Sequence, residues 1–178
     1  MLRFFLVSIL VTMTHAAAAE TVTGKVVAVS DGATITVSDL GKTQHRIRLA
    51  GIDAPESRQE FGPASKRNLS SLLFGRNVAV EWHKLDRYGR ILGKVTVSPR
   101  GCTSCTQALD AGLAQLEAGL AWWDREYRRE QSLADQGYYE YAEFDARIQR
   151  RGLWRDPSPI PPWEWRKRNL TLSALAQR

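Results

Sequence analysis

The chain has 178 residues, with 25 Lys and Arg against 19 Asp and Glu, which gives a formal net charge of +6. This length predicts one domain with a core of ordinary size, and the lack of self-similarity at a fixed period excludes a repeat array. This modest positive excess is enough to attract polyanions, but it does not prove that one is bound.

The first nineteen residues differ from the rest of the chain. Arg3 gives a positive start, the apolar run FFLVSILVTM follows, and HAAAA supplies the small residues that a signal peptidase accepts. The pattern predicts a signal peptide over residues 1–19 and export to a periplasm or to the extracellular medium. An uncleaved anchor is the alternative, but the run is short for a membrane span. No later apolar run is long enough to span, so we expect no membrane association of the mature form.

Five strands and three helices are predicted after the signal peptide. The strands are marked by β-branched runs and turn residues, and lie at 21–30, 33–39, 44–52, 77–83 and 91–98. The helices are marked by apolar residues at helical spacing, and lie at 63–74, 107–120 and 132–151. This interrupted five-strand pattern predicts an α+β fold, in which a small curved sheet closes into an OB-type barrel with three α-helices.

The predicted domain covers residues 20–155, and residues 156–178 form a basic tail rich in proline and tryptophan. The stretch DPSPIPPWEWRKR holds four of the seven prolines, which disfavours both a helix and a central strand. We therefore expect the tail to wrap over the body or to extend from it, with residues 169–178 frayed. Trp163 and Trp165 favour wrapping, because indoles gain from burial.

Cys102 and Cys105 are the only cysteines. In an oxidising compartment, such a close pair predicts a local disulfide that pins a loop. A redox-active pair and a zinc site are the alternatives. Both are less favoured, because a redox CxxC usually opens the first helix of a βαβ unit and zinc needs two further ligands.

Charged residues gather where the third predicted strand ends, in RLAGIDAPES. Arg48 lies on that strand, Asp53 and Glu56 follow in the turn, and Arg90 closes the loop between the fourth and fifth strands. Guanidinium groups can neutralise the oxygens of a phosphodiester, one carboxylate can hold a divalent cation, and another can orient or deprotonate water. The spacing therefore suits phosphodiester hydrolysis, although solvated surface ion pairs remain an alternative explanation.

Four motifs in this chain resemble those of the staphylococcal nuclease, or thermonuclease, family: VVAVSDGATITV, IRLAGIDAPE, DRYGRILGKV and LEAGLAWW. They occur in the family's order and spacing, from about residue 22 to residue 154. The resemblance implies a five-stranded OB barrel with three helices, and a Ca²⁺-dependent nuclease that cuts DNA and RNA. We expect little sequence preference, because the DRYGR segment is basic and exposed, and we expect a monomer.

The resemblance also implies roles for individual residues. Arg48 and Arg90 match the two arginines that bind the scissile phosphate and stabilise its transition state. Glu56 matches the glutamate usually assigned as general base. Asp53 matches a calcium carboxylate, and Ala54 stands where the family supplies a main-chain carbonyl to the ion.

Substrate contacts are carried over in the same way. Tyr88 matches a tyrosine that touches the nucleotide's phosphate, and Arg87 takes a neighbouring basic position. Tyr127 corresponds more loosely to a second nucleotide-contacting tyrosine. The Trp122–Trp123 pair is expected to pack rather than to stack on bases, and the tyrosines of GYYEYAEF are expected to pack the last helix onto the barrel.

One position departs from the family pattern. The family's turn reads Asp-Gly-Asp-Thr, with its second aspartate as the other calcium carboxylate, whereas this chain has Ala33 in Asp31-Gly32-Ala33-Thr34. Because calcium affinity follows the number of charged ligands, we expect reduced Ca²⁺ affinity, with Asp31 as a substitute ligand.

Three outcomes follow from this departure: a slow or calcium-demanding nuclease, a nuclease that uses another metal, or a secreted OB-fold protein that binds nucleic acid without cutting it. The first is favoured because both arginines, Glu56 and Asp53 are present. The second is least favoured because no histidine or extra acid lies nearby in the sequence. The third is the alternative function.

Overall fold

The computed structural model describes residues 20–101 and 108–176, with side chains as far as Leu170. The predicted signal peptide, residues 1–19, and the predicted Cys102–Cys105 disulfide lie outside the described residues.

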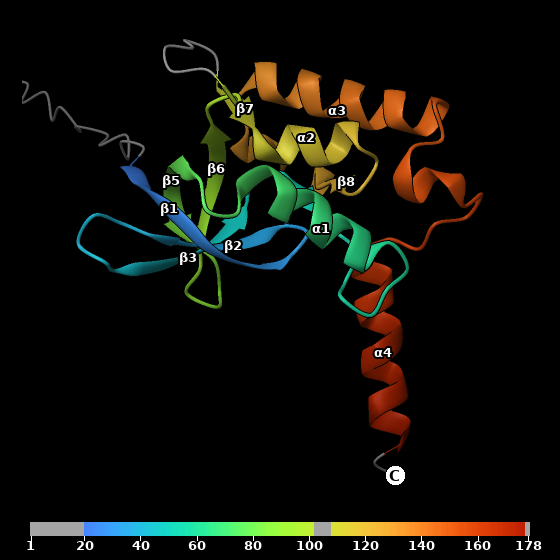
Figure 1. Ribbon diagram of the computed structural model, residues 1–178. Helices are drawn as coiled ribbons and strands as arrows, with labels where there is room; N and C mark the ends of the chain where they lie inside the picture. The colour runs from blue at the N-terminus through green and yellow to red at the C-terminus, as the bar shows by residue number, and fades with distance from the viewer. Residues whose placement is uncertain (1–19, 102–107, 177–178) are drawn as a thin grey trace, which may run out of the picture.

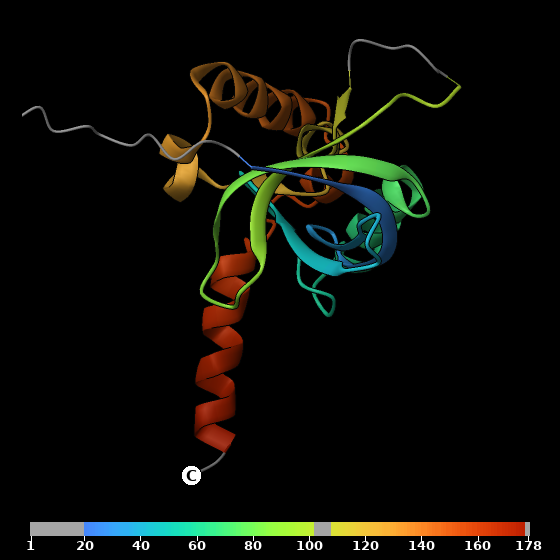
Figure 2. The same cartoon turned by 90° about the vertical axis from the view of Figure 1, so that its left-hand side faces the viewer.

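A closed barrel of five strands forms the body of the described chain. The main sheet has the order β3-β2-β1-β5-β6-β7, and an additional parallel pairing of β3 with β6 closes it. Figures 1 and 2 show the strands curling round a common interior. The bounds are β1 Glu20–Asp31, β2 Thr34–Ser38, β3 Gln44–Leu49, β5 Asn77–Leu85, β6 Ile91–Val97 and β7 Leu109–Asp110. The predicted fold class and its five strands are confirmed.

Alternating side chains fill the barrel, as the period of a half-buried strand requires. In β6, Ile91, Val95 and Val97 are buried, while Leu92, Lys94 and Thr96 are only partly covered. Gly93 continues the inward row, and a Cβ there would lie 2.6 Å from Cγ1 of Val80. The glycine therefore lets β5 and β6 approach each other inside a tightly curved sheet.

Three helices cover the barrel where the sequence predicts them: α1 Gly62–Leu73, α2 Ala111–Glu117 and α3 Leu133–Ile148. α1 buries Leu69 and Leu73 in the core. α2 is shorter than predicted, because the side chain of Asp110 caps its first turn by accepting hydrogen bonds from the N–H groups of Gly112 and Leu113. The remaining short elements are β4 Ile52–Asp53, β8 Trp122–Trp123, and the 3₁₀ helices η1 Arg125–Glu130 and η2 Gly152–Arg155.

The C-terminal tail contains a fourth helix, α4 Pro162–Ala176, which contradicts the expectation of a helix-free, frayed tail. Three of the four prolines precede the helix, and Pro162 is its first residue, where a missing N–H breaks no intrahelical hydrogen bond. α4 extends away from the body (Figure 1). Within the described ranges, no helix is both long and apolar enough to cross a membrane.

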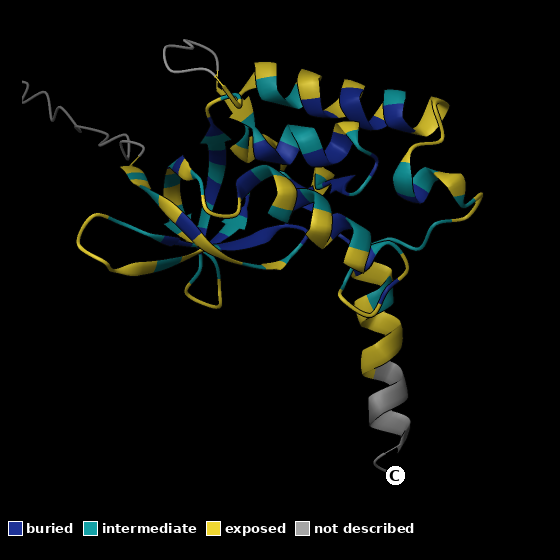
Figure 3. Cartoon of the chain, viewed as in Figure 1, coloured by how far each residue is buried: buried dark blue, intermediate teal, exposed yellow. Residues whose placement is uncertain are grey.

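The expectation that the tyrosines of α3 pack onto the barrel is correct only for Tyr139. Its ring is buried and its hydroxyl donates to Asp110, whereas Tyr138, Tyr141 and Phe144 are exposed. Figure 3 shows this exposed outer side of α3. The helix covers the body with one face only.

Candidate active site

A pocket of about 780 Å³ opens at one end of the barrel, between β3, the β5–β6 loop, η1 and the start of α4. All nine residues that the sequence singles out for catalysis, substrate binding or metal binding line it: Asp31, Arg48, Asp53, Ala54, Glu56, Arg87, Tyr88, Arg90 and Tyr127. The structure therefore brings together groups that lie far apart in the chain.

The parallel pairing of β3 with β6 places the two arginines at the same end of the barrel. Ile47 is paired with Ile91, so that Arg48 and Arg90 both lie next to this pair. Ile47 and Leu49 point into the core, and the alternation of the strand turns Arg48 outward to the pocket. Two guanidinium groups can therefore face one phosphate.

Asp86 fixes the loop that carries Arg90. One carboxylate oxygen accepts the N–H groups of Tyr88 at 2.8 Å and of Arg90 at 3.0 Å, and the other accepts Nε of Arg90 at 2.6 Å. Burial alone would raise the pKa of Asp86, but the hydrogen bonds and charge of Arg90 hold it below its usual value. This role of Asp86 was not predicted from the sequence, although Asp86 and Arg90 are the first and last residues of DRYGR.

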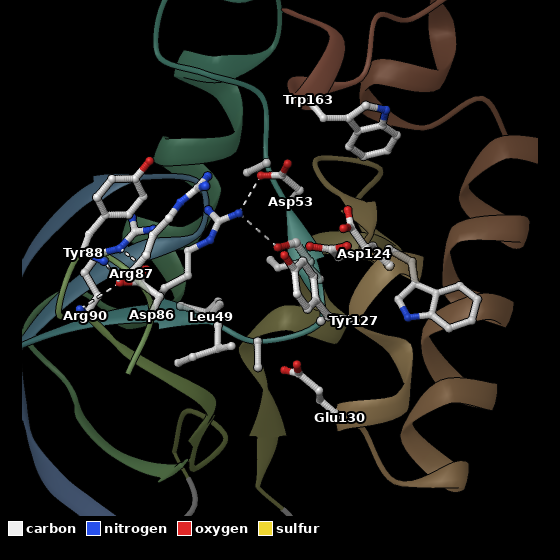
Figure 4. Close-up of a pocket in the computed structure, with 18 of the residues that line it drawn as sticks. Leu49, Asp53, Asp86, Arg87, Tyr88, Arg90, Asp124, Tyr127, Glu130 and Trp163 are labelled. Atoms are coloured by element: carbon white, nitrogen blue, oxygen red, sulfur yellow. Dashed lines mark hydrogen bonds and ion pairs between the residues drawn. The ribbon is translucent and has the colours of Figure 1, made fainter. Parts of the chain in front are cut away.

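Aromatic rings flank this basic loop. The guanidinium carbons of Arg87 and Arg90 lie 5.1 and 5.4 Å from the ring centroid of Tyr88, and Tyr88 itself is 69% exposed. Figure 4 shows this group on one side of the pocket, with Asp53, Asp124 and Tyr127 opposite. An exposed ring that is held by cations can contact a nucleotide.

The acidic corner is tied to two guanidinium groups. Asp53 is 3% exposed, and Nη2 of Arg48 donates to its Oδ1 at 2.5 Å. Arg166 of α4 donates through Nη2 to Oδ2 of Asp53 and through Nη1 to Oε1 of Glu56, both at 2.8 Å. Burial alone would lower the pKa of Arg166, but these two carboxylates raise it. Arg166 was not predicted as a site residue, because WRKR lies in the predicted tail.

Asp124 is an acid near Asp53 that the sequence analysis missed. β4 and β8 pair Asp53 with Trp122, and the N–H of Asp124 donates to the carbonyl of Gly51 at 2.9 Å, which brings Asp124 to the pocket. Burial and then the charge of Asp53 raise the pKa of the Asp124 carboxyl, with Arg48 opposing. The expectation that no extra acid lies nearby is therefore wrong in space, although correct for the neighbouring sequence.

The oxygens around Asp53 are of the kind that a hard divalent cation prefers. Asp31, Asp53, the main chain of Ala54 and Asp124 all line the pocket. The donor chemistry fits such a cation, but both oxygens of Asp53 are already hydrogen-bonded to arginine. Within the described part of the chain, no group of three or more His, Cys, Asp or Glu residues stands ready to hold a metal.

The turn that departs from the family pattern contributes one carboxylate. Oδ1 of Asp31 accepts the N–H of Ala33 at 2.8 Å, and Asp31 lines the pocket. The Ala33 side chain is fully buried in the barrel core. Position 33 therefore supplies packing and no charge.

The aromatic residues divide between the core and the rim. Trp122 and Trp123 are buried, which confirms that they pack, and Trp122 meets Trp154 edge-on at 5.4 Å between centroids. Tyr127 is 47% exposed, and the Lys84 ammonium lies 5.6 Å from its ring centroid. Tyr127 therefore remains accessible to a ligand in the pocket.

Comparison with known proteins gives a consistent result. A family model described as "Staphylococcal nuclease homologue" matches residues 46–156. An "Uncharacterized endonuclease" of Escherichia coli is 41% identical over 145 residues, which cover 82% of this chain and 85% of that protein. A "Micrococcal nuclease" of Shigella flexneri is 41% identical over 144 residues, which cover 81% of this chain and 80% of that protein. "Staphylococcal-like nuclease CAN1" of Arabidopsis thaliana is 34% identical over 68% of this chain and 33% of its own length.

Proposed function

Because this chain belongs to the staphylococcal nuclease family, we propose that it is a nuclease that hydrolyses phosphodiester bonds in DNA and RNA with little sequence preference. The observation that carries the proposal is the convergence of Arg48 and Arg90 on a pocket that also holds Asp53 and Glu56. Relatives named as nucleases support the same reaction class.

Arg48 and Arg90 bind the scissile phosphate through their guanidinium N–H groups. They stabilise the negative charge that builds on the phosphate oxygens in the transition state. Asp86 keeps the Arg90 guanidinium oriented through its contact with Nε. Arg48 is held at the other side by Asp53 and by the Ile52 carbonyl.

Glu56 accepts the proton of the attacking water, and the side chains of Arg87, Tyr88 and Tyr127 contact the flanking nucleotide. Glu56 suits the role of a base because its side chain is 41% exposed and can reach solvent. Tyr88 and Tyr127 offer exposed rings at the rim of the pocket.

Asp53, the main-chain carbonyl of Ala54 and Asp31 would hold a Ca²⁺ ion, which when bound supplies further positive charge toward the phosphate. The absence of a carboxylate at Ala33 supports a reduced calcium affinity, because affinity follows the number of charged ligands. The proposed enzyme is therefore a calcium-demanding nuclease that acts as a monomer.

The test is cleavage of a supercoiled plasmid and of a single-stranded RNA by the purified mature chain, in millimolar Ca²⁺ and in chelator. Arg48→Ala should lower kcat by about 100- to 1000-fold, the usual effect of removing one donor to a developing oxyanion. Arg46→Ala is the matched control, because Arg46 lies on the same strand but outside the pocket. Both variants should bind DNA in a salt-dependent manner.

Intact nucleic acid in every cation tested, together with salt-sensitive binding, would refute the nuclease function. That result would establish the alternative, an OB-fold protein that binds nucleic acid without cutting it. Equal cleavage by Arg48→Ala and the wild type would instead contradict the assigned catalytic role of Arg48.

We further propose that residues 1–19 are a signal peptide and that the nuclease is exported. The apolar run and the small residues before Glu20 support the proposal. Mass spectrometry of the protein recovered outside the cytoplasm should give a chain that starts close to Glu20. Recovery of the full-length chain from the cytoplasm alone would refute export.

A further inference from the structure

The first turn of α4 reaches the pocket with one face. Trp163 and Arg166 are three residues apart on the helix and therefore lie on the same side of it. Trp163 meets Trp122 edge-on at 6.4 Å between centroids, and Arg166 contacts Asp53 and Glu56. Just before the helix, the carbonyl of Ile160 accepts a hydrogen bond from the side chain of Gln59.

Arg166 occupies the oxygens that catalysis needs. Its guanidinium bridges Oδ2 of Asp53 and Oε1 of Glu56, each at 2.8 Å, while Oδ1 of Asp53 is bonded to Arg48. A carboxylate oxygen that accepts hydrogen bonds from a cation has fewer lone pairs free for a metal. Arg166 therefore takes the place of a cation between the two acids.

This contact is built to be released. The Arg166 side chain is 46% exposed and that of Glu56 is 41% exposed. Water and dissolved salt therefore weaken the electrostatic attraction between these two side chains. From Trp163 to Leu170, α4 has no buried residue, and Figure 3 shows the described part of the helix beyond its first turn as exposed. The helix is therefore held to the pocket mainly through Trp163, Arg166 and the preceding turn.

We propose that Arg166 is an internal cation that competes with the divalent cation for Asp53 and Glu56, so that α4 restrains the nuclease until the metal displaces it. The proposal rests on the proposed nuclease function. The absence of a carboxylate at Ala33 makes the competition effective, because fewer charged ligands weaken the binding of the metal and so favour the arginine. A high calcium demand is thus a property of both position 33 and α4.

The test compares Arg166→Gln with Arg168→Gln, a control on the same helix. Both variants remove one positive charge. Among the described residues, Arg168 pairs with Glu164 at 3.5 Å and does not line the pocket. Calcium binding is measured by calorimetry on the full mature chain without nucleic acid. We expect Arg166→Gln to tighten calcium binding by about tenfold, because it removes the cation that pairs with half-exposed Glu56 and with buried Asp53, and we expect Arg168→Gln to leave calcium binding unchanged.

Two further measurements distinguish competition between Arg166 and Ca²⁺ from a general effect of the substitution on activity. Cleavage by Arg166→Gln should exceed that of the wild type at limiting Ca²⁺ and equal it at saturating Ca²⁺. Trp163→Ala, which loosens α4 without changing charge, should tighten calcium binding in the same direction by a smaller factor.

Calcium binding that is unchanged, weaker or undetectable in Arg166→Gln would overturn the competition, and so would equal tightening by Arg168→Gln. Failure of the nuclease function is distinguishable from this result. Tighter calcium binding by Arg166→Gln in a protein that cleaves nothing would support the competition and refute the reaction.

Discussion

Asp86 should control the rate of cleavage without touching the substrate, because it holds the Arg90 guanidinium in place. Its two carboxylate oxygens accept three hydrogen bonds, two from main-chain N–H groups of its own loop and one from Nε of Arg90. Asp86→Asn keeps one oxygen for the main chain but removes the charge that faces Arg90. Asp86→Ala removes all three contacts.

The effect of these changes has an upper limit, which is the loss of Arg90 itself. Removing one donor to a developing oxyanion costs about 2.7–4 kcal/mol. Asp86→Ala leaves the guanidinium present but unanchored. If its misplacement costs about half of that energy, roughly 1.4–2 kcal/mol, kcat falls by about 10- to 30-fold. Asp86→Asn should fall between this variant and the wild type, because the loop is still held by its main-chain contacts.

Steady-state kinetics on a short DNA substrate at saturating Ca²⁺ checks this prediction. The loss should appear mainly in kcat, because the scissile phosphate needs Arg90 most in the transition state. Asp39→Ala is the matched control, since Asp39 accepts the Thr43 N–H at 2.9 Å and pairs with His45 in a turn that does not line the pocket. A kcat for Asp86→Ala equal to that of the control would show that Arg90 needs no support from Asp86.

Two further predictions concern the acids around Asp53. Ala33→Asp buries a carboxylate in the core, so in chelator it should lower the free energy of unfolding by about 1–3 kcal/mol, as measured by urea titration. Added Ca²⁺ should restore the lost stability. An equal loss of stability with and without Ca²⁺ would show that position 33 does not reach the ion. The pKa of the Asp124 carboxyl is raised in the folded protein. Ionisation of Asp124 therefore destabilises the folded state once the pH rises above the pKa that this carboxyl has in the unfolded chain. Asp124→Asn should therefore raise Tm in chelator near pH 7, and the gain should vanish as pH falls below the ordinary aspartate pKa; a gain that is constant with pH would refute this assignment.

The strands of the barrel could be predicted from the sequence because the patterns that define each strand lie within short segments of the chain. Alternating apolar residues such as Ile47 and Leu49 define an inward face, and short turns define where each strand ends. Arg48 and Arg90 lie in two separate sequence motifs, and the pairing of β3 with β6 brings them to the same end of the barrel. The pairings of β1 with β5 and of β3 with β6 are the long-range steps, and the family resemblance supplied them.

The helices were less predictable than the strands. Periodicity shows that a helix has an apolar face, but it does not show how much of that face is buried against the rest of the protein. Tyr138 and Tyr141 follow the spacing of α3, yet only Tyr139 is buried. Proline has a similar ambiguity. Pro162 disfavours the interior of a helix but suits its first residue, and the sequence alone did not distinguish the two.

The contacts of Arg166 and Asp124 with the site could not be read from the sequence, because each depends on a tertiary approach. Asp124 reaches Asp53 through the short β4–β8 ladder, and Arg166 through the turn before α4. Neither residue belongs to a motif that marks the site. Charged side chains in a tail are usually solvated, and nothing in the sequence around Arg166 indicates its contacts with Asp53 and Glu56.

The charges around Asp53 explain why this carboxylate needs a positive group beside it, whether that group is Arg166 or a metal ion. A carboxylate that is 3% exposed requires hydrogen bonds on both oxygens, and Arg48 reaches mainly one of them. Asp124 adds negative charge nearby, which the raised pKa of its carboxyl reflects. The second oxygen of Asp53 must then face either Arg166 or a bound cation. Because one positive group can replace the other, the same carboxylate that would hold the metal also holds the helix that excludes it.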